Sequence, residues 1–362
     1  MNVIQKSKHI YSQLLECIRE NQPCVLATVT NSQGSTPQKP GCSAIFGKNK
    51  LLAGTVGGGA VELAIGEIAS KSIRSKKSGY YKFDLGNDST DLEASICGGG
   101  MSILIDAAPE KHIDVFQSLL NSKLNRIPGV LATLCDSGSR ECSGFERFWI
   151  TAKSLENVSE QMPDEIIAAI TEMLSNPNPD KIREIVQTGP EKEEVILAFL
   201  ESVLPLPQLI IASAGHVGKA LSHLAKLLDF EVTVWDDRPE FANKNNLPDA
   251  DNILSGKLDE SIVKLKVAKD TYIVIVTRGH KNDAEVLRKF IGSDAGYIGM
   301  IGSRRKIAQV CDTFLNNGWA TIEQWEKIHT PIGLEIGSKT VQEIAVSIAA
   351  QLIQVRNEIK KG

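Results

Sequence analysis

The first two hundred residues alternate short apolar runs with helical patterns. Apolar residues at helical spacing predict a helix near the start of the chain, and a second helix is predicted over residues 60–75. Short β-type runs occupy residues 24–30, 43–46 and 51–55 and, further on, 80–85 and 101–105. Residues 107–204 alternate amphipathic helices with strands and are expected to complete the same sheet. This order predicts an α+β domain with a mixed sheet.

From Gln208 onward the pattern becomes regular. Nearly continuous Val/Ile strands at residues 208–213, 231–236, 272–277 and 297–301 alternate with amphipathic helices. Strands of this kind are buried on both faces, as in a parallel sheet covered by helices. The sequence therefore predicts a Rossmann-like, doubly wound parallel sheet. The segment Leu204-Pro-Leu-Pro207 is the best linker, which gives an N-terminal domain over residues 1–204 and a C-terminal domain over 205–362.

Composition narrows the class of protein. The chain has 362 residues, of which 42% are hydrophobic and 23% charged, with a formal net charge of −4. A globular protein is expected, and the slight acidic excess argues against coating nucleic acid. No window approaches the 18 apolar residues of a membrane span, and the first residues lack a signal-peptide pattern. Seven scattered cysteines without a CxxC pair indicate reduced thiols and a cytoplasmic location.

A corner resembling a dinucleotide-binding fingerprint follows the first C-terminal strand. Ser213-Ala-Gly215-His216-Val-Gly218 has serine where the usual G-x-G-x-x-G has its first glycine. The second glycine lets the backbone approach a pyrophosphate, and the third lets the helix pack on the strand. Asp236, 23 positions after Ser213, ends the next strand, where an acid binds a ribose hydroxyl. Alternatively, the corner serves packing and binds nothing.

Two further strand ends of the C-terminal half bear candidate ligand contacts. Ser303-Arg304-Arg305-Lys306 opens a helix, where three cations oppose the helix dipole unless an anion binds there. The alternative is that these side chains extend into water. His280 should lie at the same sheet edge, to contact a ligand or act as an acid or base, and Asp283 is expected to be an N-cap.

Three glycine-rich loops mark the N-terminal half: GSTPQKPG, GTVGGG and CGGG, all between Gly34 and Gly100. Glycine loops that open helices offer unblocked N–H groups to phosphate and other oxyanions. Glu62 either joins such a site or simply complements the helix dipole. The candidate residues in these loops are Gly34, Ser35, Thr36, Gly57, Gly58, Gly59, Glu62, Cys97, Gly98 and Gly99.

Among the seven cysteines, Cys97 is the strongest candidate for a functional role. A lone cysteine is usually a small core residue, and Cys17, Cys24 and Cys311 are interpreted that way. Cys97 instead precedes three glycines, whose N–H groups can stabilise a thiolate and which leave room for a ligand. A core role and a functional role both remain open for it. Cys42 is a weaker second candidate.

Taken together, these motifs resemble the XdhC/CoxI family of molybdenum-enzyme maturation factors. The three glycine loops resemble its N-terminal domain. The segments that resemble its C-terminal Rossmann domain are SAGHVGKAL, VWDDR, TRGHKND, GYIGMIGSRRK and PIGLEIGSKTVQEIAVSIAAQLI. Ala60 stands where many members have a cysteine. The match spans nearly the whole chain in the expected order.

The resemblance implies an accessory factor rather than a turnover enzyme. Such a factor binds the molybdenum cofactor (molybdopterin), protects its sulfurated form and delivers it to a xanthine dehydrogenase-type molybdenum hydroxylase. A cysteine desulfurase would supply the sulfur, and Cys97 would be a soft ligand near molybdenum. The opposing hypothesis is an NAD(P)-dependent oxidoreductase that uses Gly215, Gly218 and Asp236, with His280 as proton donor. A third hypothesis is a pure assembly protein whose domains bind only partners. Under any of the three, pairing of two Rossmann domains would give a homodimer.

Overall fold

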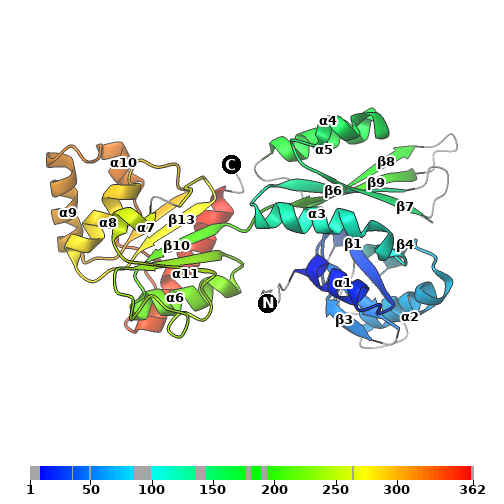
Figure 1. Ribbon diagram of the computed structural model, residues 1–362, viewed down its shortest axis with the longest axis horizontal. Coiled ribbons are helices and arrows are strands. Elements are labelled where there is room, and N and C mark those ends of the chain that lie inside the picture. The colour runs from blue at the N-terminus through cyan, green and yellow to red at the C-terminus, as the bar shows by residue number, and fades with distance from the viewer. Residues whose placement is uncertain are drawn as a thin grey trace. The chain divides into compact units, whose positions relative to one another are not determined.

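The computed structural model describes residues 9–34, 36–48, 50–84, 99–135, 144–176, 181–188, 194–262 and 265–359. The chain divides into two compact units, Met1–Pro205 and Leu206–Gly362 (Figure 1). Each unit has its own sheets and its own apolar core. Among the described residues, no helix combines the length and the apolar character needed to cross a bilayer.

The first unit begins with a five-stranded sheet of order β3-β2-β1-β5-β4. Its central strand β1 is buried on both faces, because Val25, Ala27 and Val29 pack toward helix α2 while Leu26 packs toward α1 and α3. The bounds are β1 Cys24–Gly34, β2 Ser43–Gly47, β3 Leu51–Gly54, β4 Gly79–Asp84, β5 Gly99–Asp106, α1 Ile10–Arg19, α2 Gly59–Ser75 and α3 Ile113–Leu124, with a 3-10 turn at Pro109–His112.

A second, four-stranded sheet of order β7-β6-β9-β8 completes this unit. Helix α5 covers its outer face through Ile166, Ile170 and Met173 (Figure 1). The inner face lies against the first sheet, where Phe199 of β9 packs on Leu104 of β5. The bounds are β6 Gly129–Cys135, β7 Phe145–Ile150, β8 Ile182–Thr188, β9 Glu194–Val203, α4 Leu155–Val158 and α5 Asp164–Ser175, with a 3-10 turn at Ser159–Gln161.

The predicted fold class is confirmed, but the N-terminal strand arrangement differs from the expected single mixed sheet. There are two sheets, and every strand pairing described in them is antiparallel. Helix α2 is a crossover that returns the chain parallel to β3, yet it delivers β4 to the opposite edge, so the two strands never pair. Strands of the middle region pair with one another, because they form a separate layer that buries its inner face on the first sheet.

The second unit is the predicted doubly wound sheet, with parallel strands in the order β12-β11-β10-β13-β14. Leu209 and Ile211 of β10 face helices α6 and α11, whereas Ile210 and Ala212 face α8 and α9 (Figure 1). The strands are β10 Gln208–Ala212, β11 Glu231–Asp236, β12 Asn252–Ser255, β13 Thr271–Ile275 and β14 Tyr297–Met300. The helices are α6 His216–Leu227, α7 Leu258–Ile262, α8 His280–Phe290, α9 Arg304–Asn316, α10 Ile322–Glu326 and α11 Val341–Ile359.

Candidate ligand-binding cleft

A cleft of about 100 Å³ opens where the strand order of the parallel sheet reverses. From β10 the chain continues to β11 on one side, while β13 lies on the other side and continues to β14. Ligands of doubly wound sheets bind outside the carboxyl ends of the strands at this switch point. The residues that line the cleft are Ser213, Trp235, Asp236, Asp237, Arg238, Thr277, Arg278 and Asn282.

Asp236 lies in the cleft wall as the sequence predicts, but its oxygens are already occupied. The Arg238 side chain donates from Nε to Oδ1 at 2.8 Å and from Nη2 to Oδ2 at 2.9 Å. The backbone N–H of Arg238 adds a bond to Oδ1 at 3.1 Å, and that of Ala214 one to Oδ2 at 2.8 Å. Burial raises the pKa of Asp236, but these hydrogen bonds outweigh it and lower the pKa below its ordinary value. A carboxylate offers about four acceptor sites, and here all are used within the protein.

The fingerprint corner is built around Ser213. Its φ of +125° is a backbone conformation that side-chain-bearing residues rarely adopt. The Ser213 hydroxyl accepts the Gly215 N–H at 3.1 Å and lies 3.4 Å from Asp236 Oδ2. A Cβ on Gly218 would come within 1.9 Å of the Ser213 carbonyl oxygen, so glycine is required for this helix to approach the strand. His216, the first residue of α6, is exposed.

Asp283 fixes the loop that follows β13 and does not cap helix α8 as expected. Its carboxylate is fully buried and accepts from the Thr277 N–H at 3.0 Å, the Thr277 hydroxyl at 2.5 Å and Lys306 Nζ at 2.9 Å. Gly279 is the N-cap instead, because its φ of +83° makes the turn into the helix. His280 is the first residue of α8, and its side chain lies outside the described part of the chain.

The three cationic side chains at the start of α9 differ in their surroundings, since one binds within the fold and two are exposed to solvent. Ser303 is the N-cap, and its hydroxyl accepts the Lys306 N–H at 3.4 Å. Lys306 turns inward to Asp283, as described above. Arg304 and Arg305 are exposed; Arg304 Nη2 lies 3.8 Å from Glu335 Oε1, with both side chains at least 90% exposed. Neither arginine lines the cleft.

In the first unit the structure brings the glycine loops together. Gly34, at the end of β1, pairs in register with Gly99 at the start of β5. The second loop lies against the first, since a Cβ on Gly57 would come within 2.7 Å of Pro37 Cγ. The Thr36 hydroxyl donates to the Gln38 carbonyl at 3.0 Å and shapes the first loop. Ser35, Cys97 and Gly98 lie outside the described residues.

Gly57, Gly58 and Gly59 lead into helix α2 with φ values of +138°, +72° and +54°. A Cβ on Gly58 or Gly59 would meet no atom within 4 Å, so both glycines border open space. Glu62 folds back over the loop and accepts from the Thr55 hydroxyl at 2.6 Å and the Val56 N–H at 3.2 Å. Burial raises the pKa of Glu62, but the hydrogen bonds from this loop outweigh it and lower the pKa. The loop thus binds an oxyanion that the chain itself supplies.

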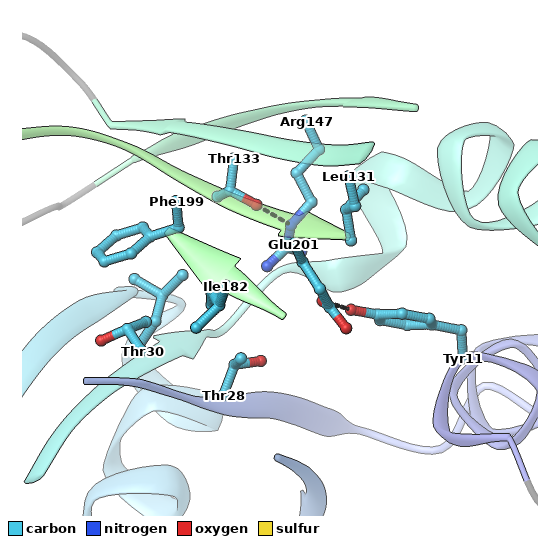
Figure 2. A pocket seen from close by; sticks show the side chains of 10 residues that line it. Tyr11, Thr28, Thr30, Leu131, Thr133, Arg147, Ile182, Phe199 and Glu201 are labelled. Atoms are coloured by element: carbon cyan, nitrogen blue, oxygen red, sulfur yellow. Dashed lines mark hydrogen bonds between the residues drawn. The ribbon is translucent and has the colours of Figure 1, made fainter. Parts of the chain in front are cut away.

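A buried polar cluster between the two sheets of the first unit has no counterpart among the sequence predictions (Figure 2). Arg147 forms an ion pair with Asp106, each side chain 3% exposed, and its Nε donates to the Thr133 hydroxyl at 3.2 Å. Beside this pair the Tyr11 hydroxyl donates to Glu201. The cluster encloses about 10 Å³, room for roughly one water molecule. It joins the two sheets, and it is too small for a cofactor.

Comparison with known proteins identifies the family. Residues 209–352 match the model of the XdhC Rossmann domain, and residues 17–84 match that of the XdhC and CoxI family. The chain belongs to the XdhC family. The family resemblance is therefore confirmed, and the matched residues include the first two glycine loops and the fingerprint corner.

Two curated proteins are similar to this XdhC family member over nearly its whole sequence. A Bacillus subtilis protein named as a probable xanthine dehydrogenase subunit is 22% identical over 96% of this chain and 98% of its own. The uncharacterized protein YqeB of Escherichia coli is also 22% identical over 98% of this chain, which spans about half of YqeB (47%). The fold is shared with a crystal structure described as a xanthine dehydrogenase from Bacillus halodurans, with a TM-score of 0.71, 23% identity and 95% of both chains covered.

Proposed function

We propose that this protein is a maturation factor for a xanthine dehydrogenase-type molybdenum hydroxylase. In this role it binds the molybdenum cofactor, protects the sulfurated form and passes it to the hydroxylase. The main support is the convergence of the glycine-rich loops at one end of the strands of the first sheet, where Gly34 of β1 pairs with Gly99 of β5 and Gly57 lies against Pro37. The client class is supported by the family and by the Bacillus subtilis relative, whose name refers to xanthine dehydrogenase.

The residues present fit an anionic pterin cargo. Gly58 and Gly59 border open space at the start of helix α2, a kind of position that binds phosphate oxygens. A phosphate bound there would take the place of the Glu62 carboxylate, which accepts the Val56 N–H in this structure. Cys97 is expected to contribute a thiolate near molybdenum, a soft ligand for a soft metal centre. In the proposed sequence of events a cysteine desulfurase supplies the terminal sulfur before delivery.

Anoxic titration of the purified protein with molybdenum cofactor tests this role, with NAD and NADP measured in parallel. We expect tight cofactor binding that weakens in Cys97→Ser and persists in the matched control Cys311→Ser, whose cysteine lies on α9 of the other unit. Dinucleotide binding without cofactor binding would instead favour the NAD(P)-dependent oxidoreductase. Unchanged activation of the hydroxylase by Cys97→Ser would favour an assembly protein that binds only partners.

A further inference from the structure

Helix α2 has one covered face and one exposed face. Val61, Ile65 and Ala69 are buried and pack in the core of the first sheet. Leu63, in contrast, is 75% exposed. Three positions further along, a Cβ on Gly66 would meet no atom within 4 Å. Glycine inside a helix costs about 0.5–1 kcal/mol relative to alanine, and no neighbour among the described residues requires it here. The exposed face thus presents a large apolar side chain beside open space.

A basic patch lies at the second half of this helix. The Ser70 hydroxyl donates to the Lys48 carbonyl oxygen at 2.6 Å, which holds the segment between β2 and β3 beside α2. The cations of the basic patch, all of them exposed, are Lys48, Lys50, Lys71, Arg74, Lys76 and Lys77. Among them only Lys76 forms an ion pair with a described residue, Glu110. Residues 48–77 contain these six cations and two acidic residues, although the chain has a net charge of −4. The patch is therefore a local excess of positive charge.

The exposed leucine connects the basic patch with the glycine loop that precedes α2. Residues four and seven positions apart lie on one face of a helix, so Leu63 shares its face with Gly59 and Ser70. Gly59 belongs to the loop for which cofactor binding is proposed, and Ser70 holds the basic patch in place. A partner that covers Leu63 and the basic patch would therefore also lie next to this loop.

We propose that the exposed face of α2 and the basic patch form the docking surface for the client molybdenum hydroxylase. The hydroxylase provides an apolar pocket for Leu63 and acidic side chains for the cations. The inference rests on the proposed function, because the client must reach the loop from which it receives the cofactor. Complementary charge fixes the orientation of two partners and raises the rate of their encounter, while a buried apolar anchor supplies affinity. A nucleic acid would match the charges but would leave Leu63 in water.

The test measures binding of the full chain to the cofactor-free xanthine dehydrogenase of the same organism by surface plasmon resonance. The variants are Leu63→Glu and the double charge reversal Lys71→Glu with Arg74→Glu. Leu227→Glu is the control for the first, because Leu227 is an exposed leucine on α6 of the second unit. The control for the second reverses two exposed cations with the same spacing, Lys266 and Lys269. Thermal unfolding verifies the fold of each variant, and titration with molybdenum cofactor measures its cargo binding.

We expect Leu63→Glu and the double charge reversal each to weaken hydroxylase binding by about tenfold or more, and both controls to leave it unchanged. Added salt should weaken the binding of wild type more than that of the double charge reversal, because the reversal removes charges that salt would screen. Binding of molybdenum cofactor should be the same in all variants, since none of the substituted side chains belongs to the glycine loops.

The proposal is wrong if wild type does not bind the hydroxylase, or if Leu63→Glu binds it as wild type does or no more weakly than Leu227→Glu. Two further results would assign the surface to another occupant and also overturn the proposal. One is a loss of binding to a cysteine desulfurase in place of the hydroxylase, and the other is a wild-type dimer that Leu63→Glu converts to monomers in sedimentation. Absence of cofactor binding in wild type would instead refute the proposed function, and a hydroxylase complex that depends on Leu63 would remain. The two proposals can therefore fail separately.

Discussion

Each unit of this protein contains a buried aspartate paired with an arginine, and the two pairs differ in what surrounds them. Asp106 and Arg147 are each 3% exposed and lie between two sheets. Asp236 is equally buried, but Arg238 is 22% exposed and lines a cleft. The same kind of ion pair thus joins two sheets in one unit and forms part of a cleft wall in the other. Burial of the acid does not distinguish these roles; the exposure of its partner does.

The largest effect on stability is expected when the buried ion pair of Asp106 and Arg147 is broken. Arg147→Met leaves the Asp106 carboxylate buried without its cation and should lower the free energy of unfolding by about 3–5 kcal/mol. Urea unfolding of the purified variant measures this loss. The double variant Arg147→Met with Asp106→Leu removes both charges and should recover most of the stability. If the double variant is as unstable as Arg147→Met, the loss of stability does not come from the unpaired charge of Asp106 alone.

Arg238→Met should cost less, about 1–3 kcal/mol, because Asp236 keeps the backbone N–H donors of Ala214 and residue 238. The same urea experiment compares the two arginines directly. An equal loss at both sites would contradict the distinction between a sheet-fastening pair and a cleft-forming pair.

The sequence predicts the second unit better than the first for a physical reason. Strands such as 208–213 are buried on both faces, so their apolar runs identify a parallel sheet without knowledge of the partners. In the first unit local periodicity reveals strands but not which strands pair, and the crossover α2 spans the sheet from edge to edge. The pairing emerges only from long-range packing.

The spacing of the fingerprint motif predicts correctly that Asp236 ends the second strand of the parallel sheet. It cannot reveal that both carboxylate oxygens already accept hydrogen bonds from the protein. That depends on the turn in which Arg238, two residues later, folds back on the carboxylate. Arg147 is harder still, because its partner Asp106 lies 41 residues away on another sheet. A lone arginine in a strand is usually solvated, and nothing local marks this one as buried.

The buried cluster also predicts a pH dependence opposite in sign to that of Asp236, whose pKa is lowered. Burial raises the pKa of Glu201 above its ordinary value. The stabilisation by the protonated Glu201 carboxyl is complete below the pKa that this group has in the unfolded chain. It is lost as pH rises through the raised pKa that Glu201 has in the folded protein. Glu201→Gln does not titrate and keeps an oxygen for the Tyr11 hydroxyl. Between pH 4 and 8 the free energy of unfolding of this variant, relative to that of wild type, should therefore rise. The rise should be about 1.4 kcal/mol for each unit by which folding raises the pKa of Glu201. Unfolding curves across that range measure the gain, and a constant difference would exclude Glu201 as the titrating group.

The smallest effect concerns the strained corner of the cleft. Ser213 holds a φ of +125°, which costs a residue with a side chain about 1–3 kcal/mol. Ser213→Ala keeps that strain and loses the bond from the Gly215 N–H, whereas Ser213→Gly removes the strain at an entropic cost of roughly 0.5–1 kcal/mol. Thermal unfolding should therefore rank the glycine variant above the alanine variant by about 1 kcal/mol. The reverse order would mean that the corner is relaxed. The serine would then have to be explained by its hydroxyl alone, which accepts the Gly215 N–H and donates to Asp236 in the cleft wall.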